Sequence, residues 1–160
     1  MALEIERKFL VADASWRPLV QRRELLRQGY LANTARCSVR VRLAGEQGWL
    51  SVKAMTPGIA RAEYEAAVPA ADAAEMLDGL CEGPLVEKWR HHVVYENREW
   101  EIDEFLGENA GLVIAELELE AADAVFGRPP WLGAEVTDDV RYYNFRLATH
   151  PWRRWPENRA

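Results

Sequence analysis

The segment Glu4-Ile5-Glu6-Arg7-Lys8 lies close to the N-terminus and decides the fold expected for this sequence. Side chains of a β-strand alternate between its two faces, so a strand here places Glu4, Glu6 and Lys8 on one face. Ile5 lies on the opposite, mostly apolar face. One such strand would most simply have a solvated face and a core face. The same alternation recurs along the chain, however, and this recurrence indicates a shared charged surface.

Further segments of the sequence also place ionic side chains at every second position. They are residues 38–43, 50–53, 61–65, 88–92, 99–103 and 116–120. The acids of this face are Glu4, Glu6, Glu63, Glu65, Glu101, Asp103, Glu116, Glu118 and Glu120, and the bases are Lys8, Arg40, Arg42, Lys53, Arg61, Lys88 and Arg90. A solubility surface normally mixes Lys and Glu with small polar residues, whereas this face is rich in Arg. We therefore interpret it as a binding surface.

The overall composition is typical of one globular domain. The chain has 160 residues, of which 49% are hydrophobic and 29% are charged. We expect a single domain over residues 1–148 and a C-terminal tail over 149–160. The net charge of −6 argues against a nucleic-acid partner. Because the sequence has no membrane-span pattern and no signal-peptide pattern, we expect a cytoplasmic protein with no membrane partner. For its oligomeric state, we expect either a monomer or a homodimer.

Strand signals predict a mainly β protein. Together with the charged segments, strands are expected over residues 25–31, 86–95, 99–105 and 112–120. An antiparallel sheet of this many strands tends to curl and close, so we expect a barrel.

The sequence predicts three helices, the first and the last of them from the helical spacing of their apolar residues. One covers residues 69–81, a short one lies near 121–126, and the last begins at Thr137 or Asp138. Helical stripes and apolar strand faces must bury each other, so the helices belong outside the barrel and the charged face lines its interior. The tail after Pro151 is expected to be loosely ordered or to form an accessory contact.

The charged face needs a ligand. Uncompensated burial of a single ion costs several kcal/mol, so an interior with this many ions is expected to be wet and occupied. Clustered carboxylates suit hard cations such as Mg²⁺ or Mn²⁺, whereas clustered Arg and Lys suit phosphate oxygens. A metal-chelated polyphosphate, a small molecule, satisfies both groups.

The ordered set of charged motifs resembles the CYTH, or triphosphate tunnel metalloenzyme, family. Glu4-x-Glu6-x-Lys8 is similar to the signature on that family's first strand. The resemblance continues through Arg40-x-Arg42, Lys53, Arg61-x-Glu63-x-Glu65, Lys88-x-Arg90, Glu101-x-Asp103 and Glu116-x-Glu118, and so spans nearly the whole chain. It implies a closed or cup-like antiparallel barrel of eight strands with the C-terminal helix near one tunnel end. It also implies divalent-metal-dependent cleavage of a triphosphate.

The resemblance further implies a role for each matched position. The implied phosphate ligands are Lys8, Arg40, Arg42, Lys53, Arg61 and Arg90. The implied metal-site residues, direct or through water, are Glu4, Glu6, Glu63, Glu65, Asp103, Glu116 and Glu118. The metal would be Mg²⁺ or Mn²⁺, with two ions bound.

Two roles are open for Lys88. Surrounded by other bases and metal ions, its ammonium would be disfavoured, which lowers its pKa and makes it a candidate catalytic base. The alternative is a lysine that only binds phosphate.

Three functions are open for the chain as a whole. The first is a triphosphatase that acts on inorganic triphosphate, with thiamine or nucleoside triphosphates as alternative substrates. The second is a class IV adenylate cyclase, in which the 3′-hydroxyl of ATP attacks its own α-phosphate. The third is a non-enzymatic sensor of polyphosphate or nucleotides. We favour inorganic triphosphate because the sequence offers no obvious nucleobase pocket, and the many carboxylates argue against a sensor.

Overall fold

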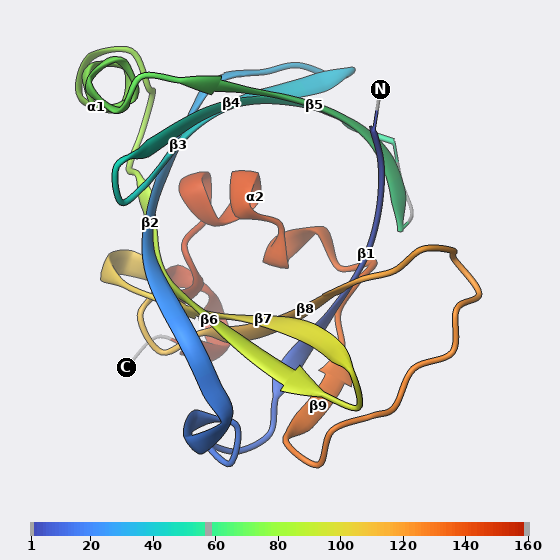
Figure 1. Ribbon diagram of the computed structural model, residues 1–160. Coiled ribbons are helices and arrows are strands. Elements are labelled where there is room, and N and C mark those ends of the chain that lie inside the picture. Colours follow the sequence, from blue (N-terminus) through green and yellow to red (C-terminus); the bar gives the residue numbers. More distant parts are fainter. Residues whose placement is uncertain (1, 57–58, 159–160) are drawn as a thin grey trace.

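Eight antiparallel strands close around a central axis in the computed structural model, which describes residues 2–56 and 59–158 (Figure 1). The strands follow the order β5-β4-β3-β2-β6-β7-β8-β1, and β1 also pairs with β5, which closes the ring. The barrel strands are β1 (Ala2–Val11), β2 (Val20–Asn33), β3 (Cys37–Ala44), β4 (Gln47–Ala54), β5 (Ala60–Val68), β6 (Val86–Tyr95), β7 (Arg98–Phe105) and β8 (Val113–Glu118). The expected eight-stranded barrel is therefore confirmed.

Two features of the sheet were not expected from the sequence. Strand β2 begins at Val20, well before residue 25, because its first half pairs with β6 and its second half with β3. A ninth strand, β9 (Leu132–Glu135), pairs with the end of β1 outside the barrel ring. Its four residues are too few to give a recognisable alternation, and its pairing depends on β1 being in place.

The predicted helix over residues 69–81 is present as α1 (Ala70–Gly79). It packs outside β3 and β4 and buries Ala73 and Leu77 against Val41. Gly48 allows this close approach, because a Cβ atom at that position would lie 2.8 Å from the Cβ of Ala73. The outer face of this part of the barrel is thus covered by a helix, as expected.

The remaining outer core is covered by irregular chain. Phe9, Trp100 and Trp131 are fully buried against the segment that follows β8. The helix expected near residues 121–126 is wrong, since this segment forms turns and extended chain. Phe126 packs edge-on against both Phe9 and Trp100, and such contacts outweigh the weak helical tendency of a six-residue segment.

The last predicted helix begins later than expected and lies inside the ring of strands. Residues Val140–Tyr142 form a 3₁₀ turn, and α2 (Asn144–Thr149) follows. Leu147 of α2 packs against Val86 and Phe105, which occupy inward-facing positions at one end of the barrel. Figure 1 shows α2 within the ring of strands. The interior is therefore ionic over part of its length and apolar at the end that α2 fills. The barrel is a cup.

The C-terminal tail packs against this closed end. Two 3₁₀ turns, Trp152–Arg154 and Pro156–Asn158, follow α2. Trp155 is buried, with its ring edge-on to Tyr142 at 5.0 Å between centroids. The loosely ordered alternative is thus wrong for residues 152–158, whereas a domain boundary at residue 148 stays a prediction. Over residues 2–56 and 59–158, no helix has the length and apolarity needed to cross a membrane.

Candidate active site

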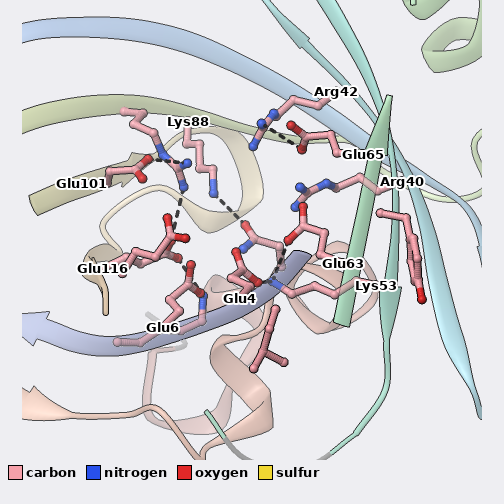
Figure 2. A pocket seen from close by; sticks show the side chains of 16 residues that line it. Glu4, Glu6, Arg40, Arg42, Lys53, Glu63, Glu65, Lys88, Glu101 and Glu116 are labelled. Carbon is pink, nitrogen blue, oxygen red and sulfur yellow. Dashed lines mark hydrogen bonds and ion pairs between the residues drawn. The ribbon is translucent and has the colours of Figure 1, made fainter. Parts of the chain in front are cut away.

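The interior of the cup holds a cavity of about 680 Å³ with a strongly charged wall (Figure 2). Its side chains come from seven of the barrel strands and from the first residue of α2. The lining residues are Leu3, Glu4, Glu6, Lys8, Arg40, Arg42, Lys53, Glu63, Tyr64, Glu65, Lys88, Arg90, Glu101, Glu116, Glu118 and Asn144. Most of the residues singled out in the sequence thus lie around one space.

Three residues of the predicted charged face lie elsewhere. Arg61 lines a smaller cavity of about 30 Å³ beside α2, with its guanidinium 4.8 Å from the ring centre of Tyr143. Asp103 is fully buried behind the cavity wall. Glu120 follows the end of β8 and pairs with Arg98 on the exterior at 3.0 Å, so its expected place on the inner face is wrong. The alternation of faces holds only while the strand continues.

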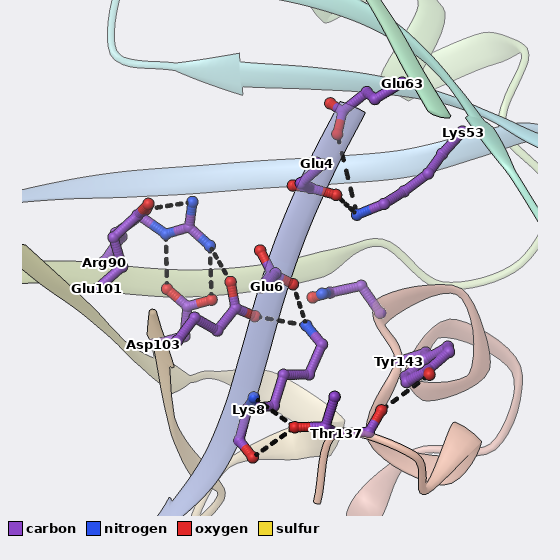
Figure 3. Close-up of polar contacts among 12 residues, drawn as sticks. Glu4, Glu6, Lys8, Lys53, Glu63, Arg90, Glu101, Asp103, Thr137 and Tyr143 are labelled. Carbon is purple, nitrogen blue, oxygen red and sulfur yellow. Dashed lines mark hydrogen bonds and ion pairs between the residues drawn. The ribbon is translucent and has the colours of Figure 1, made fainter. Parts of the chain in front are cut away.

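The register between β1 and β8 decides which of their charged side chains pair in the cavity wall. Lys8 lies directly opposite Glu116, and Glu6 lies opposite Glu118. Residues opposite each other in an antiparallel pair share a face, so their side chains meet. The ammonium of Lys8 donates to Glu116 at 2.7 Å and lies 3.0 Å from Glu6 (Figure 3). Two segments that are over a hundred residues apart thereby form one ionic cluster.

Asp103 anchors two cations at once. Arg90 donates to both carboxylate oxygens of Asp103, each at 2.8 Å, and the Nζ atom of Lys88 lies 2.6 Å from the same carboxylate. Arg90 also reaches Glu101 at 2.5 Å and Glu116 at 3.4 Å. Both oxygens of Asp103 are therefore engaged by bases, and a metal ion could reach them only by displacing one of these partners.

The opposite wall presents bases that are less fully paired. Lys53 contacts Glu4 and lies 3.9 Å from Glu63, while Arg42 lies 3.7 Å from Glu65. The Nε atoms of Arg40 and Arg42 are buried and have no hydrogen-bond partner among residues 2–56 and 59–158. Because an unpaired buried donor is costly, these two guanidinium groups are suited to an incoming anion.

Lys8 and Lys88 experience different fields although both are buried. The carboxylates of Glu116 and Glu6 outweigh burial and raise the pKa of Lys8. For Lys88, burial outweighs the attraction of Asp103, and neighbouring Arg90 adds to it, so its pKa falls to about 8. Lys88 is thus the more readily deprotonated of the two lysines, in the direction that the sequence predicted.

The carboxylates of the cavity are crowded. Burial, followed by the charge of Glu116, raises the pKa of Glu6, and burial together with nearby Glu4 and Glu6 raises the pKa of Glu118. A divalent cation would relieve this repulsion, and carboxylate oxygens are the ligands that Mg²⁺ and Mn²⁺ prefer. The carboxylates of the cavity therefore suit a hard cation. Among the described residues, no three Asp, Glu, His or Cys side chains converge as a ready-made metal site. Several of the cavity carboxylates face bases instead.

Asn144 is a site residue that no sequence motif marks. Its Oδ1 atom accepts a hydrogen bond from Nζ of Lys88 at 3.0 Å, and it lines both the large and the small cavity. An isolated Asn at the start of a short helix has no pattern that marks it. Its role follows only from where α2 lies.

The eight-stranded barrel with a charged interior matches a known protein family. A CYTH-domain model matches residues 2–145, and the chain belongs to this family. Membership implies dependence on a divalent metal ion.

Individual proteins with similar sequences or structures are inorganic triphosphatases. An inorganic triphosphatase of Acetivibrio thermocellus is 46% identical over 157 residues, which covers 98% of this chain and 100% of that protein. One from Nitrosomonas europaea is 39% identical, covering 91% of this chain and 96% of the other. A crystal structure of an inorganic triphosphatase is 38% identical, with a TM-score of 0.64, and covers 91% of this chain and 97% of that one.

Proposed function

We propose that this protein hydrolyses inorganic triphosphate to diphosphate and phosphate within the charged cup, with the help of divalent metal ions. The observation that carries the proposal is the cavity wall, where six bases alternate with seven acids around about 680 Å³. The bases alone would suffice to bind an anion, and the acids alone would suffice to bind a cation. A triphosphate with bound cations uses both.

The bases are proposed to bind the phosphate oxygens. Lys8, Arg40, Arg42, Lys53 and Arg90 surround the cavity, and positive groups fixed in place stabilise the charge that spreads over the oxygens during phosphoryl transfer. Arg61 lies outside the main cavity, so it would act on a phosphate group only through the smaller one.

The acids are proposed to hold Mg²⁺ or Mn²⁺, with two ions bound. The candidate ligands at the cavity wall are Glu4, Glu6, Glu63, Glu65, Glu116 and Glu118. For Asp103 the contacts favour anchoring Arg90 and Lys88 over direct metal ligation. A bound divalent ion would offset phosphate charge and lower the pKa of a water ligand.

Lys88 is the proposed catalytic residue. It lies in the cavity wall, is held by Asp103 and Asn144, and has a pKa that burial lowers to about 8. These features suit a group that takes a proton from the attacking water. Direct contact with a phosphate oxygen is the alternative role.

The test is phosphate release from inorganic triphosphate, with ATP, thiamine triphosphate and diphosphate alongside, each with Mg²⁺, Mn²⁺ or EDTA. Rapid metal-dependent release from inorganic triphosphate is expected, with much less from the others. Cyclic AMP as the main product from ATP would instead make the protein a cyclase. Tight binding of triphosphate without any turnover would make it a sensor. The cytoplasmic location and the monomeric or dimeric state remain part of the proposal.

A further inference from the structure

Asn144 joins the C-terminal helix to the candidate catalytic lysine. It is the first residue of α2, and its side chain lies at the boundary between the two interior cavities. Lys88, which comes from the barrel wall, is almost completely buried, with 1% of its surface exposed. A contact between them therefore connects the wall of the cup to its floor.

The contact fixes the direction of the Lys88 ammonium. An ammonium group has three N–H donors. Nζ of Lys88 donates to Oδ1 of Asn144 at 3.0 Å and lies 2.6 Å from the carboxylate of Asp103. These two acceptors stand at fixed places and so fix the direction of the third donor position of Nζ. Lys88 lines the cavity (Figure 2).

The start of α2 is itself held from two sides. The hydroxyl of Tyr143 donates to the carbonyl of Thr137 at 2.8 Å, and the hydroxyl of Thr137 accepts from the backbone N–H of Lys8 at 3.0 Å (Figure 3). Leu147 is fully buried, and its carbonyl accepts from Asn109 at 3.3 Å. Asn144 is therefore in place without any ligand, which is the condition for a supporting residue to orient another side chain.

We propose that Asn144 is a positioning residue that fixes the Lys88 ammonium against the cavity. This inference rests on the proposed function. An amide suits the task because it accepts a hydrogen bond from the lysine without adding a further negative charge beside a polyanionic substrate. Asp103 alone would hold Nζ through one contact and leave its direction free.

Three single variants test the inference by steady-state turnover of inorganic triphosphate. Asn144→Leu removes the acceptor at similar volume and is expected to lower kcat about tenfold or more, with KM changed less than about threefold. Asn144→Asp keeps an acceptor and is expected to recover most of kcat, with a raised KM from charge repulsion. Arg146→Ala, on the exposed side of the same helix, is the matched control and should leave both constants unchanged.

A double-mutant cycle separates positioning from general support of the fold. If Asn144 acts through Lys88, then Asn144→Leu should cost little in a Lys88→Ala background, because residues that act as a unit are not additive. Additive losses would overturn the inference. A raised KM at unchanged kcat in Asn144→Leu would also overturn it, because it would mean that Asn144 contacts phosphate directly. Asn144→Ser repeats the cycle if the leucine variant does not fold. Absence of turnover in the unaltered protein would overturn the proposed function itself.

Discussion

Single side chains in this barrel have properties that their neighbours impose. Lys8 and Lys88 are both buried and both line the same cavity, yet the pKa of the first is raised and that of the second is lowered. The difference arises because the carboxylates of Glu6 and Glu116 outweigh burial at Lys8. At Lys88, burial outweighs the attraction of Asp103, and the charge of Arg90 adds to the effect of burial. Equal residue types can therefore have unequal chemical roles within one site.

Lys88→Arg is the residue-scale test of catalysis. An arginine keeps the positive charge but does not lose its proton at accessible pH. If Lys88 is a base, kcat should fall by about 10² or more while KM for inorganic triphosphate changes little. The measurement is phosphate release under saturating metal. Retained turnover with near-normal KM would limit Lys88 to phosphate binding.

Gln28→Leu is expected to stabilise the protein. Gln28 is fully buried, and neither its Oε1 nor its Nε2 atom has a hydrogen-bond partner in the part of the chain that the structure describes. An unpaired buried amide costs about 1–3 kcal/mol, which a leucine of similar volume would not incur. Urea denaturation should show a free energy of unfolding that is higher by about 1 kcal/mol.

The matched control is Gln21→Leu, which changes an exposed residue of the same strand. It should alter the free energy of unfolding by less than about 0.5 kcal/mol. A marked loss of stability in Gln28→Leu would mean that the buried amide has a partner, such as an internal water.

At the scale of elements, the helices α1 and α2 have different roles, one outside the barrel and one inside it. α1 covers the outer surface of β3 and β4 and contributes no residue to the cavity lining. α2 enters the barrel, closes one end with Leu147, and carries Asn144 to Lys88. Both helices are held by buried leucines, so a comparison of the two separates stability from function.

Leu77→Ala and Leu147→Ala should both lower the free energy of unfolding by about 2–5 kcal/mol, because each removes a buried side chain. Leu147→Ala should also reduce kcat for inorganic triphosphate, since α2 then holds Asn144 less firmly. Leu77→Ala should leave kcat unchanged at temperatures where it is folded. Equal effects of the two variants on kcat would contradict a functional role for the position of α2.

At the scale of the whole molecule, the interior is a balanced set of internal ion pairs. Bases that would bind phosphate already face carboxylates, as Lys53 faces Glu4 and Glu63. An anion that binds alone must compete with these carboxylates, and a cation that binds alone must compete with the bases. When both bind, each ligand takes one partner of the pair, so metal and triphosphate should favour each other's binding.

Thermal unfolding can measure this coupling. A non-hydrolysable imido analogue of triphosphate and Mg²⁺ are each expected to raise Tm modestly when added alone, the analogue in the presence of EDTA. Together they should raise Tm by more than the sum of the two shifts, because linked ligands stabilise the folded state jointly. The same Tm with the analogue in EDTA and in Mg²⁺ would contradict the exchange of partners.

Much of the fold and of the site could be predicted from the sequence. The period-two alternation of charge is a local property of each strand, and it correctly placed residues such as Glu6, Lys53 and Glu116 on the inner face. The same reasoning failed at Glu120, which lies past the end of β8, and it gave no warning that Asp103 would be enclosed by its neighbours.

The sequence by itself thus determined the barrel and the chemical composition of its cavity, because strand alternation and residue type are written locally. Only the tertiary structure decided which charges pair, since the register of β1 against β8 joins segments distant in the chain. It also decided the irregular cover that includes Phe126, the added strand β9 and the place of Asn144. These features depend on packing between distant segments, which outweighs the weak preferences of short stretches of chain.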